Sequence, residues 1–149
     1  MTPFVLRFLE HVHGSLGWLA ALALCHPATL LRRPRRRALA VAAAATALTT
    51  LVAAIGATLY PAYRATVKPL LYAASSVAGD AFERKEHLGV FVVVLAWVGL
   101  LSHWSACNDR STGSARSLAR VAFVAYAAAA ALAVFDAALG IFVSAHREF

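Results

Sequence analysis

Charged side chains are scarce in this sequence, and the motifs of common soluble enzymes are missing from it. Asp, Glu, Lys and Arg make up 14% of the residues, against about 25% in an average soluble domain. The chain has no Gly-rich phosphate loop, no nucleophile elbow and no zinc-protease helix, so nothing in it favours kinase or hydrolase chemistry. Hydrophobic residues are correspondingly abundant: they make up 61% of the chain, well above the usual ~45–50%.

The hydrophobic residues are gathered into four long runs, at 4–31, 38–60, 88–105 and 118–145. A helix needs about 20 apolar residues to cross the ~30 Å hydrocarbon core of a bilayer, and each run comes close to that length or exceeds it. The runs use most of the 149 residues, which leaves no soluble domain of useful size. We therefore expect an all-α integral membrane protein, an up-down four-helix bundle that forms a single four-span transmembrane domain over residues 1–149.

The basic residues are gathered at the ends of these runs. Eight of the 14 lysines and arginines lie on one side: five in the 32–37 connection, and Arg110, Arg116 and Arg120 around the 106–117 connection. Because basic loops stay in the cytoplasm, we expect both termini to be extracytoplasmic, as in a bacterial inner-membrane protein, and Pro34 to form a tight turn. Such clusters suit anionic headgroups, so the net charge of +7 predicts a lipid bilayer as the partner and no nucleic acid.

The 61–86 connection is much longer than the other two. Its apolar positions Val67, Leu70, Leu71, Ala74 and Val77 are close to helical spacing. We therefore expect a short amphipathic helix that lies at the outer membrane interface. The alternative is that the tyrosines and basic residues of this segment only anchor it among the headgroups.

Ionisable residues inside membrane spans usually face the bundle interior. The first and third spans run parallel, so their outer ends lie at one level and their inner ends at another. The polar residues of these spans therefore form two layers. The outer layer contains Glu10, His11, His13, Glu83, Glu86, His87 and His146, and the inner layer contains Cys25, His26, His103 and Cys107. Asp136 lies about two turns inside the fourth span. Its expected partner is Arg7 or an outer-layer histidine, in a structural or a proton-relay role.

Two histidine layers on two parallel helices resemble the b-type cytochromes of respiratory chains, in which one histidine from each helix ligates each haem. The resemblance is architectural and covers only the first and third spans. It implies an outer haem b held by His11 or His13 with His87, and an inner haem b held by His26 with His103. The separations of 15 and 16 residues within each span correspond to about 22 and 24 Å of helix rise.

Arg64 and Lys68, in the 61–86 connection, are expected to neutralise the haem propionates. Helical phase limits the number of haems: at about 100° per residue, positions 11 and 26 lie about 60° apart, and positions 87 and 103 about 160° apart. We therefore expect one haem, or two haems that use different faces of the third span. The predicted function is electron transfer, in exchange with quinone or with other membrane redox subunits. Whether the protein is an enzyme stays open.

Two alternatives stay open beside haem. The same five histidines suit a non-haem copper, iron or zinc ion, since Glu83 and His87 share a helix face at i,i+4, as do His103 and Cys107. On that hypothesis Cys25 and the adjacent His26 complete an inner tetrahedral site. The second alternative is a non-catalytic membrane subunit or scaffold whose histidines are structural.

Overall fold

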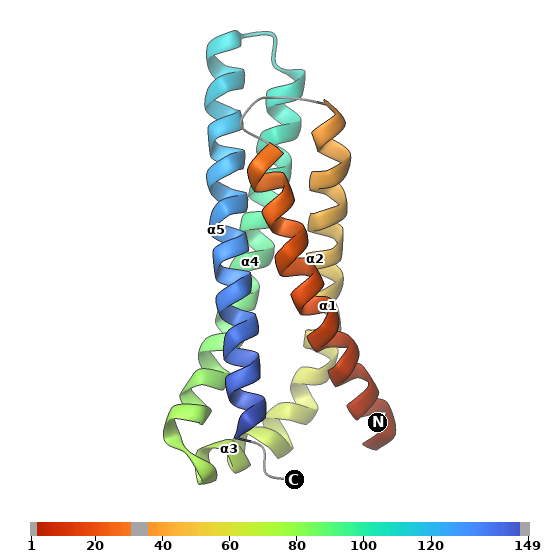
Figure 1. Ribbon diagram of the computed structural model, residues 1–149, viewed down its shortest axis with the longest axis vertical. Helices are drawn as coiled ribbons and strands as arrows, with labels where there is room; N and C mark the ends of the chain where they lie inside the picture. Colours follow the sequence, from red (N-terminus) through yellow and green to blue (C-terminus); the bar gives the residue numbers. More distant parts are fainter. Residues whose placement is uncertain (1–2, 31–35, 147–149) are drawn as a thin grey trace.

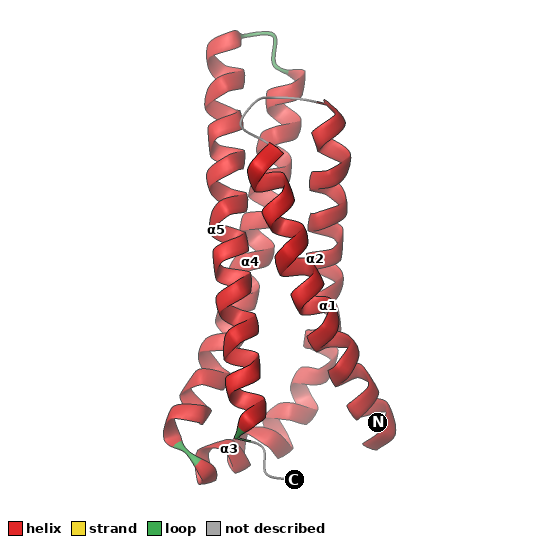
Figure 2. Ribbon diagram, in the orientation of Figure 1, coloured by secondary structure: helices red, strands yellow, loops and turns green. Residues whose placement is uncertain are grey.

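The computed structural model describes residues 3–30 and 36–146, and these residues are almost entirely helical (Figure 2). The elements follow in the order α1 (Pro3–Leu30), α2 (Arg36–Ala62), the π-helical turn η1 (Tyr63–Val67), α3 (Lys68–Ala74), α4 (Ser76–Asn108) and α5 (Thr112–Ala145). No strand occurs in either described range. The all-α prediction is therefore confirmed, while the predicted turn at Pro34 lies outside the described residues.

The four long helices α1, α2, α4 and α5 run along the long axis of the molecule, with alternating direction (Figure 1). α5 packs against α4 and α1, and α2 packs against α1 and α4, which leaves α1 and α4 at opposite corners. The turn between α4 and α5 lies at one end of the molecule, called the turn end below. The start of α1, the end of α5 and the whole of α3 lie at the other, called the termini end (Figure 1).

Three segments are long and apolar enough to cross a membrane: Arg37–Ala74, Ser76–Asn108 and Thr112–Ala145. Large apolar side chains on these segments point away from the rest of the protein. Leu51, Phe91 and Val124, for example, are 52%, 59% and 61% exposed. An apolar surface spread along whole helices suits lipid rather than water. These segments indicate an integral membrane protein.

The first predicted span is the exception. α1 covers almost all of the 4–31 run, but it is not among the described helices that are apolar enough to cross a membrane. Arg7, Glu10, His11 and His13 lie in its first three turns, and charged groups are the most expensive ones to place in hydrocarbon. Length and apolarity thus support three of the four predicted spans.

The 61–86 connection is helical for nearly its whole length. α2 continues through η1 into α3, and the one non-helical residue is Ser75, whose extended backbone (φ −163°, ψ 127°) ends α3 and starts α4. α4 thus begins at residue 76, twelve residues before the predicted span at 88. A short helix is present at 68–74, with Val67 and Leu71 buried and Leu70 and Val77 exposed. Its position at a membrane interface stays a prediction.

Small residues surround one buried tyrosine at the centre of the molecule. Tyr126 of α5 has no exposed surface. Its hydroxyl lies 2.7 Å from the Thr46 hydroxyl of α2 and 3.0 Å from the carbonyl oxygen of Ala42, to which it donates. Thr46 also lies within donating distance, 3.3 Å, of the Ala96 carbonyl oxygen of α4. Gly99 of α4 leaves the space that the tyrosine ring fills, and close approach of this kind joins α2, α4 and α5.

Candidate functional site

The five predicted ligand histidines differ in burial. His103 is fully buried and His13 is part-buried, whereas His11, His26 and His87 are exposed. On each helix the exposed histidines lie about 140–150° around from the middle of the face that packs inward. Each predicted haem pair therefore includes at least one outward-facing imidazole, and the structure does not bring the members of any pair face to face.

Three histidines at the termini end are held through Nδ1. His13 of α1 lies with Nδ1 3.1 Å from the Val52 carbonyl oxygen of α2. His87 and His146 each make the same contact to the carbonyl oxygen four residues earlier, at 2.8 and 2.9 Å. Because a carbonyl only accepts, Nδ1 carries the proton in each case, and Nε2 of the neutral ring keeps its lone pair. The His13 ring also lies against Gly56, where an added Cβ would be 2.9 Å from Cε1.

The inner-layer residues are not gathered into one group. Nε2 of His103 lies 3.6 Å from Sγ of Cys107, one turn further along α4. Cys25 lies on α1 and donates its thiol hydrogen to the carbonyl oxygen of Ala21, while the side chain of His26 is exposed. Both cysteines are free thiols. Within the described residues, no group of three or more His, Cys, Asp or Glu side chains is placed to hold a metal ion.

The two cations expected at haem propionates both contact side chains of the protein itself. Lys68, at the start of α3, forms an ion pair with Glu83 of α4 and lies 6.0 Å from the centre of the Tyr72 ring. Arg64 donates to the Tyr60 hydroxyl at 3.1 Å and lies 5.9 Å from the centre of the same ring. These contacts connect η1 to α2 and α3 to α4.

An ionic cluster that the sequence analysis did not anticipate joins three helices near the termini end. Nζ of Lys85 on α4 lies 3.5 Å from Oδ2 of Asp136 on α5, and Lys85 is close enough to His13 of α1 for the two groups to interact electrostatically. The Lys85 stem runs beside Gly140, where an added Cβ would be 3.1 Å from Cε. The Lys85 and Asp136 side chains are only 26% and 20% exposed. The ion-pair partner of Asp136 is thus Lys85, rather than Arg7 or a histidine.

Two carboxylate oxygens at this end are buried without a hydrogen-bond partner among the described residues: Oδ1 of Asp136 and Oε1 of Glu86. A buried carboxylate oxygen without a donor is costly, so each is a place where a hydrogen-bonding group is favoured. The termini end therefore holds two half-buried carboxyl groups, each with one oxygen that lacks a hydrogen-bond partner among the described residues. Comparison of the chain with known protein families, with curated protein sequences and with solved structures finds no match.

Proposed function

We propose that the chain is a four-helix membrane bundle in which α1 is the fourth span, and that it serves as a non-catalytic subunit or scaffold for other membrane proteins. α1 packs against both α2 and α5. Its Phe8, Leu19 and Leu22 side chains are 58%, 53% and 65% exposed, and a face of this kind suits lipid or a neighbouring membrane helix. The polar residues at 7–13 then lie at the level of the headgroups.

The proposed orientation follows from the basic residues. The turn end carries the described arginines at the start of α2 and around the α4–α5 turn, so it faces the cytoplasm, and both termini are extracytoplasmic in a bacterial inner membrane. In this orientation α3 lies at the outer interface. Its exposed Leu70 faces the boundary between acyl chains and headgroups, where amphipathic helices bind.

The subunit role is supported by the hydrogen bonds that three histidines make to backbone carbonyl groups. His13, His87 and His146 each place Nδ1 on a backbone carbonyl oxygen, and the His13 bond links α1 to α2. A hydrogen bond of this kind contributes about 0.5–1.5 kcal/mol net. The His13 imidazole thus stabilises the packing of α1 on α2, whereas His87 and His146 each bond within one helical turn. The exposed apolar faces of the bundle are available to other membrane proteins.

Replacing His13 tests this structural role. His13→Leu removes the bond to the Val52 carbonyl, so we expect it to lower the free energy of unfolding by about 1 kcal/mol. His26→Leu, on the same helix and exposed, is the matched control and should change that free energy by less than about 0.5 kcal/mol. Reversible unfolding in a mild detergent measures both. A His26→Leu variant as damaged as His13→Leu would contradict the structural role.

One observation favours haem as the second candidate function. An imidazole that donates from Nδ1 to a carbonyl is oriented to bind a metal through Nε2, and His13 and His87 both make this contact. On this hypothesis one or two haem b groups transfer electrons to or from quinone or another membrane redox subunit. Copper, iron or zinc are the alternative cofactors for the same imidazoles.

The visible spectrum and metal content of the purified protein distinguish the two candidates. Protein from haem-replete cells that is colourless and free of stoichiometric copper, iron and zinc supports the subunit role. A Soret band with a sharp α band on reduction supports haem. In that case His87→Ala should remove more cofactor per folded chain than His26→Ala, since lost support for a ligand weakens retention by roughly 10–100-fold. Full retention in His87→Ala, with loss in His103→Ala, would place the haem at the turn end.

A further inference from the structure

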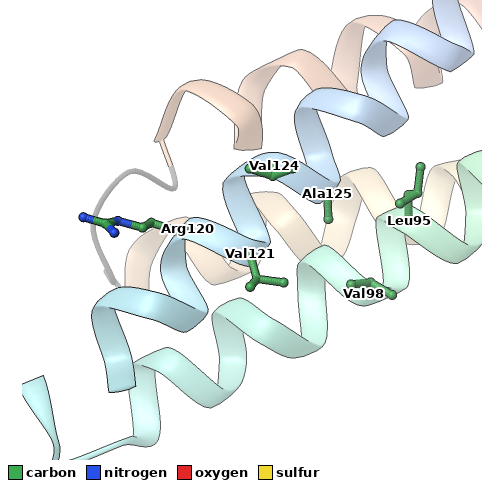
Figure 3. A pocket seen from close by; sticks show the side chains of 6 residues that line it. All are labelled: Leu95, Val98, Arg120, Val121, Val124 and Ala125. Atoms are coloured by element: carbon green, nitrogen blue, oxygen red, sulfur yellow. The ribbon is translucent and has the colours of Figure 1, made fainter. Parts of the chain in front are cut away.

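A shallow groove runs between α4 and α5 on the apolar surface of the molecule (Figure 3). Its volume is about 390 Å³. The residues that line it are Leu95, Val98, Arg120, Val121, Val124 and Ala125. Five of the six side chains are aliphatic and offer no hydrogen-bonding group. Val98, Val121 and Val124 are 40%, 47% and 61% exposed, so the groove is open to whatever surrounds the helices.

Arg120 gives this groove one charged end. The Cα–Cβ bonds of a helix tilt toward its N-terminus, and α5 begins at the turn end, so the Arg120 side chain extends toward that end. Figure 3 shows it pointing away from the aliphatic residues of the groove. Neither of the two ion pairs between described residues includes Arg120. Of the described residues, Arg37, Arg110 and Arg116 also lie at this end, beside the acid Asp109, so its electrostatic field attracts anions.

The geometry points to an anionic phospholipid as the ligand of this groove, with its phosphate on the Arg120 guanidinium and part of an acyl chain along the aliphatic residues. An arginine side chain matches a phosphate through two parallel N–H···O bonds. Val121 and Val124 continue from Arg120 along α5, and Val98 and Leu95 of α4 form the facing wall. An acyl chain attached below the phosphate therefore meets only aliphatic side chains. The assignment depends on these helices spanning a bilayer, and not on any role of the histidines.

Native mass spectrometry of the full chain in a mild detergent tests this assignment, with phosphatidylglycerol and phosphatidylcholine of identical acyl chains added in equal amounts. We expect the wild type to retain one phosphatidylglycerol about five-fold better than phosphatidylcholine, the ratio that one arginine supplies at an anionic headgroup. Arg120→Gln should abolish the preference. The control Arg110→Gln removes the same charge from the α4–α5 turn, outside the groove, and should keep it.

A second pair of variants tests the aliphatic part of the groove. Val98→Trp fills it from α4 and should lower the retention of both lipids. Val124→Trp fills it from α5 and replaces the first variant if far-UV circular dichroism shows that Val98→Trp has lost helix. Unchanged lipid retention in a correctly folded tryptophan variant would overturn the acyl-chain assignment.

Three results would overturn the proposal as a whole. Equal retention of the two lipids by the wild type would show that the groove does not select anionic headgroups. An equal loss of preference in Arg120→Gln and Arg110→Gln would assign selection to the general positive charge of the turn end. A dimer that retains no lipid and that Val98→Trp dissociates would assign the groove to a second copy of the chain.

Discussion

Replacing Gly99 with alanine should destabilise the protein, although alanine is the better helix former. A Cβ added at Gly99 would lie 2.6 Å from Cδ2 and 2.7 Å from Cε2 of Tyr126, well inside the ~3.5 Å at which carbon atoms attract. The ring cannot easily turn away, because Tyr126 is fully buried and its hydroxyl is held by Thr46 and Ala42 of α2. Either α4 moves away from α5, or the tyrosine leaves its hydrogen bonds.

Opposing contributions determine how much Gly99→Ala changes the free energy of unfolding. Alanine is favoured over glycine inside a helix by about 0.8–1 kcal/mol. Overpacking a filled interior costs typically about 1–3 kcal/mol, and loss of a hydroxyl hydrogen bond adds about 1 kcal/mol. We therefore expect Gly99→Ala to lower the free energy of unfolding by about 1–3 kcal/mol. A Cβ at Gly89, on the same helix, meets no atom within 4 Å, so Gly89→Ala should be neutral or stabilise by up to ~1 kcal/mol.

A double-mutant cycle shows whether the tyrosine ring is the cause. The wild type, Gly99→Ala, Tyr126→Ala and the double variant are unfolded reversibly in mixed micelles of increasing denaturing-detergent content, and helix content is followed by far-UV circular dichroism. If the ring causes the penalty, Gly99→Ala costs nothing in the Tyr126→Ala background, and the coupling energy is about 1–3 kcal/mol. The reasoning is refuted if the penalty is the same with and without the ring, or if Gly99→Ala and Gly89→Ala behave alike.

Lys85→Met leaves the Asp136 carboxylate without its cation and should lower the free energy of unfolding by about 3 kcal/mol in the same detergent assay, whereas Lys85→Met combined with Asp136→Leu should regain most of it. Asp109 accepts hydrogen bonds from the Ser114 side chain and the Ser111 backbone, which hold the pKa of its carboxyl below the ordinary value. That stabilisation is present above the unfolded pKa near ~3.9 and is lost as pH falls through the folded value, so Asp109→Asn should remove this acid dependence in unfolding titrations. A topology reporter fused after residue 149 should give an extracytoplasmic signal, and a cytoplasmic signal would reverse the orientation.

The apolar runs predicted the helices but not where they begin. The runs at 38–60, 88–105 and 118–145 fall wholly within α2, α4 and α5, because a long apolar stretch is most stable as a helix in lipid. α4 nevertheless extends twelve residues further toward its N-terminus, through charged residues that a hydropathy argument treats as a loop. The start is marked by Ser75, whose hydroxyl accepts from the Ala78 N–H. A search for capping residues finds this boundary, whereas a search for apolar residues does not.

The histidines were grouped in the sequence by their level along the helices, while the structure separates them by face. The predicted offset of about 160° between His87 and His103 corresponds to one exposed and one fully buried imidazole. Phase alone does not say which of the two points inward. The small residues indicate that it is His103: this histidine lies one turn after Gly99 and two turns after Ala96, on the face of α4 that packs closely against its neighbours. The position along the helix and the helical phase together therefore separate these histidines by face, which the position along the helix alone does not.

The Lys85–Asp136 pair follows from register once the helices have their full length. α4 and α5 are joined by residues 109–111, so positions equally far from residue 110 lie opposite one another in the antiparallel pair. Counting 25 residues back reaches Lys85, and counting 25 forward reaches residue 135, next to Asp136. If the third span begins at residue 88 instead, Lys85 lies in a loop and has no defined position opposite α5. An aspartate inside an apolar run needs a partner at its own level, and Gly140, one turn further along α5, leaves room for the lysine stem. The acid and the glycine are visible in the sequence, but the short turn is not, because the apolar runs leave a connection at 106–117. Counting across the turn therefore identifies Lys85 as the partner only once α4 and α5 have their structural ends.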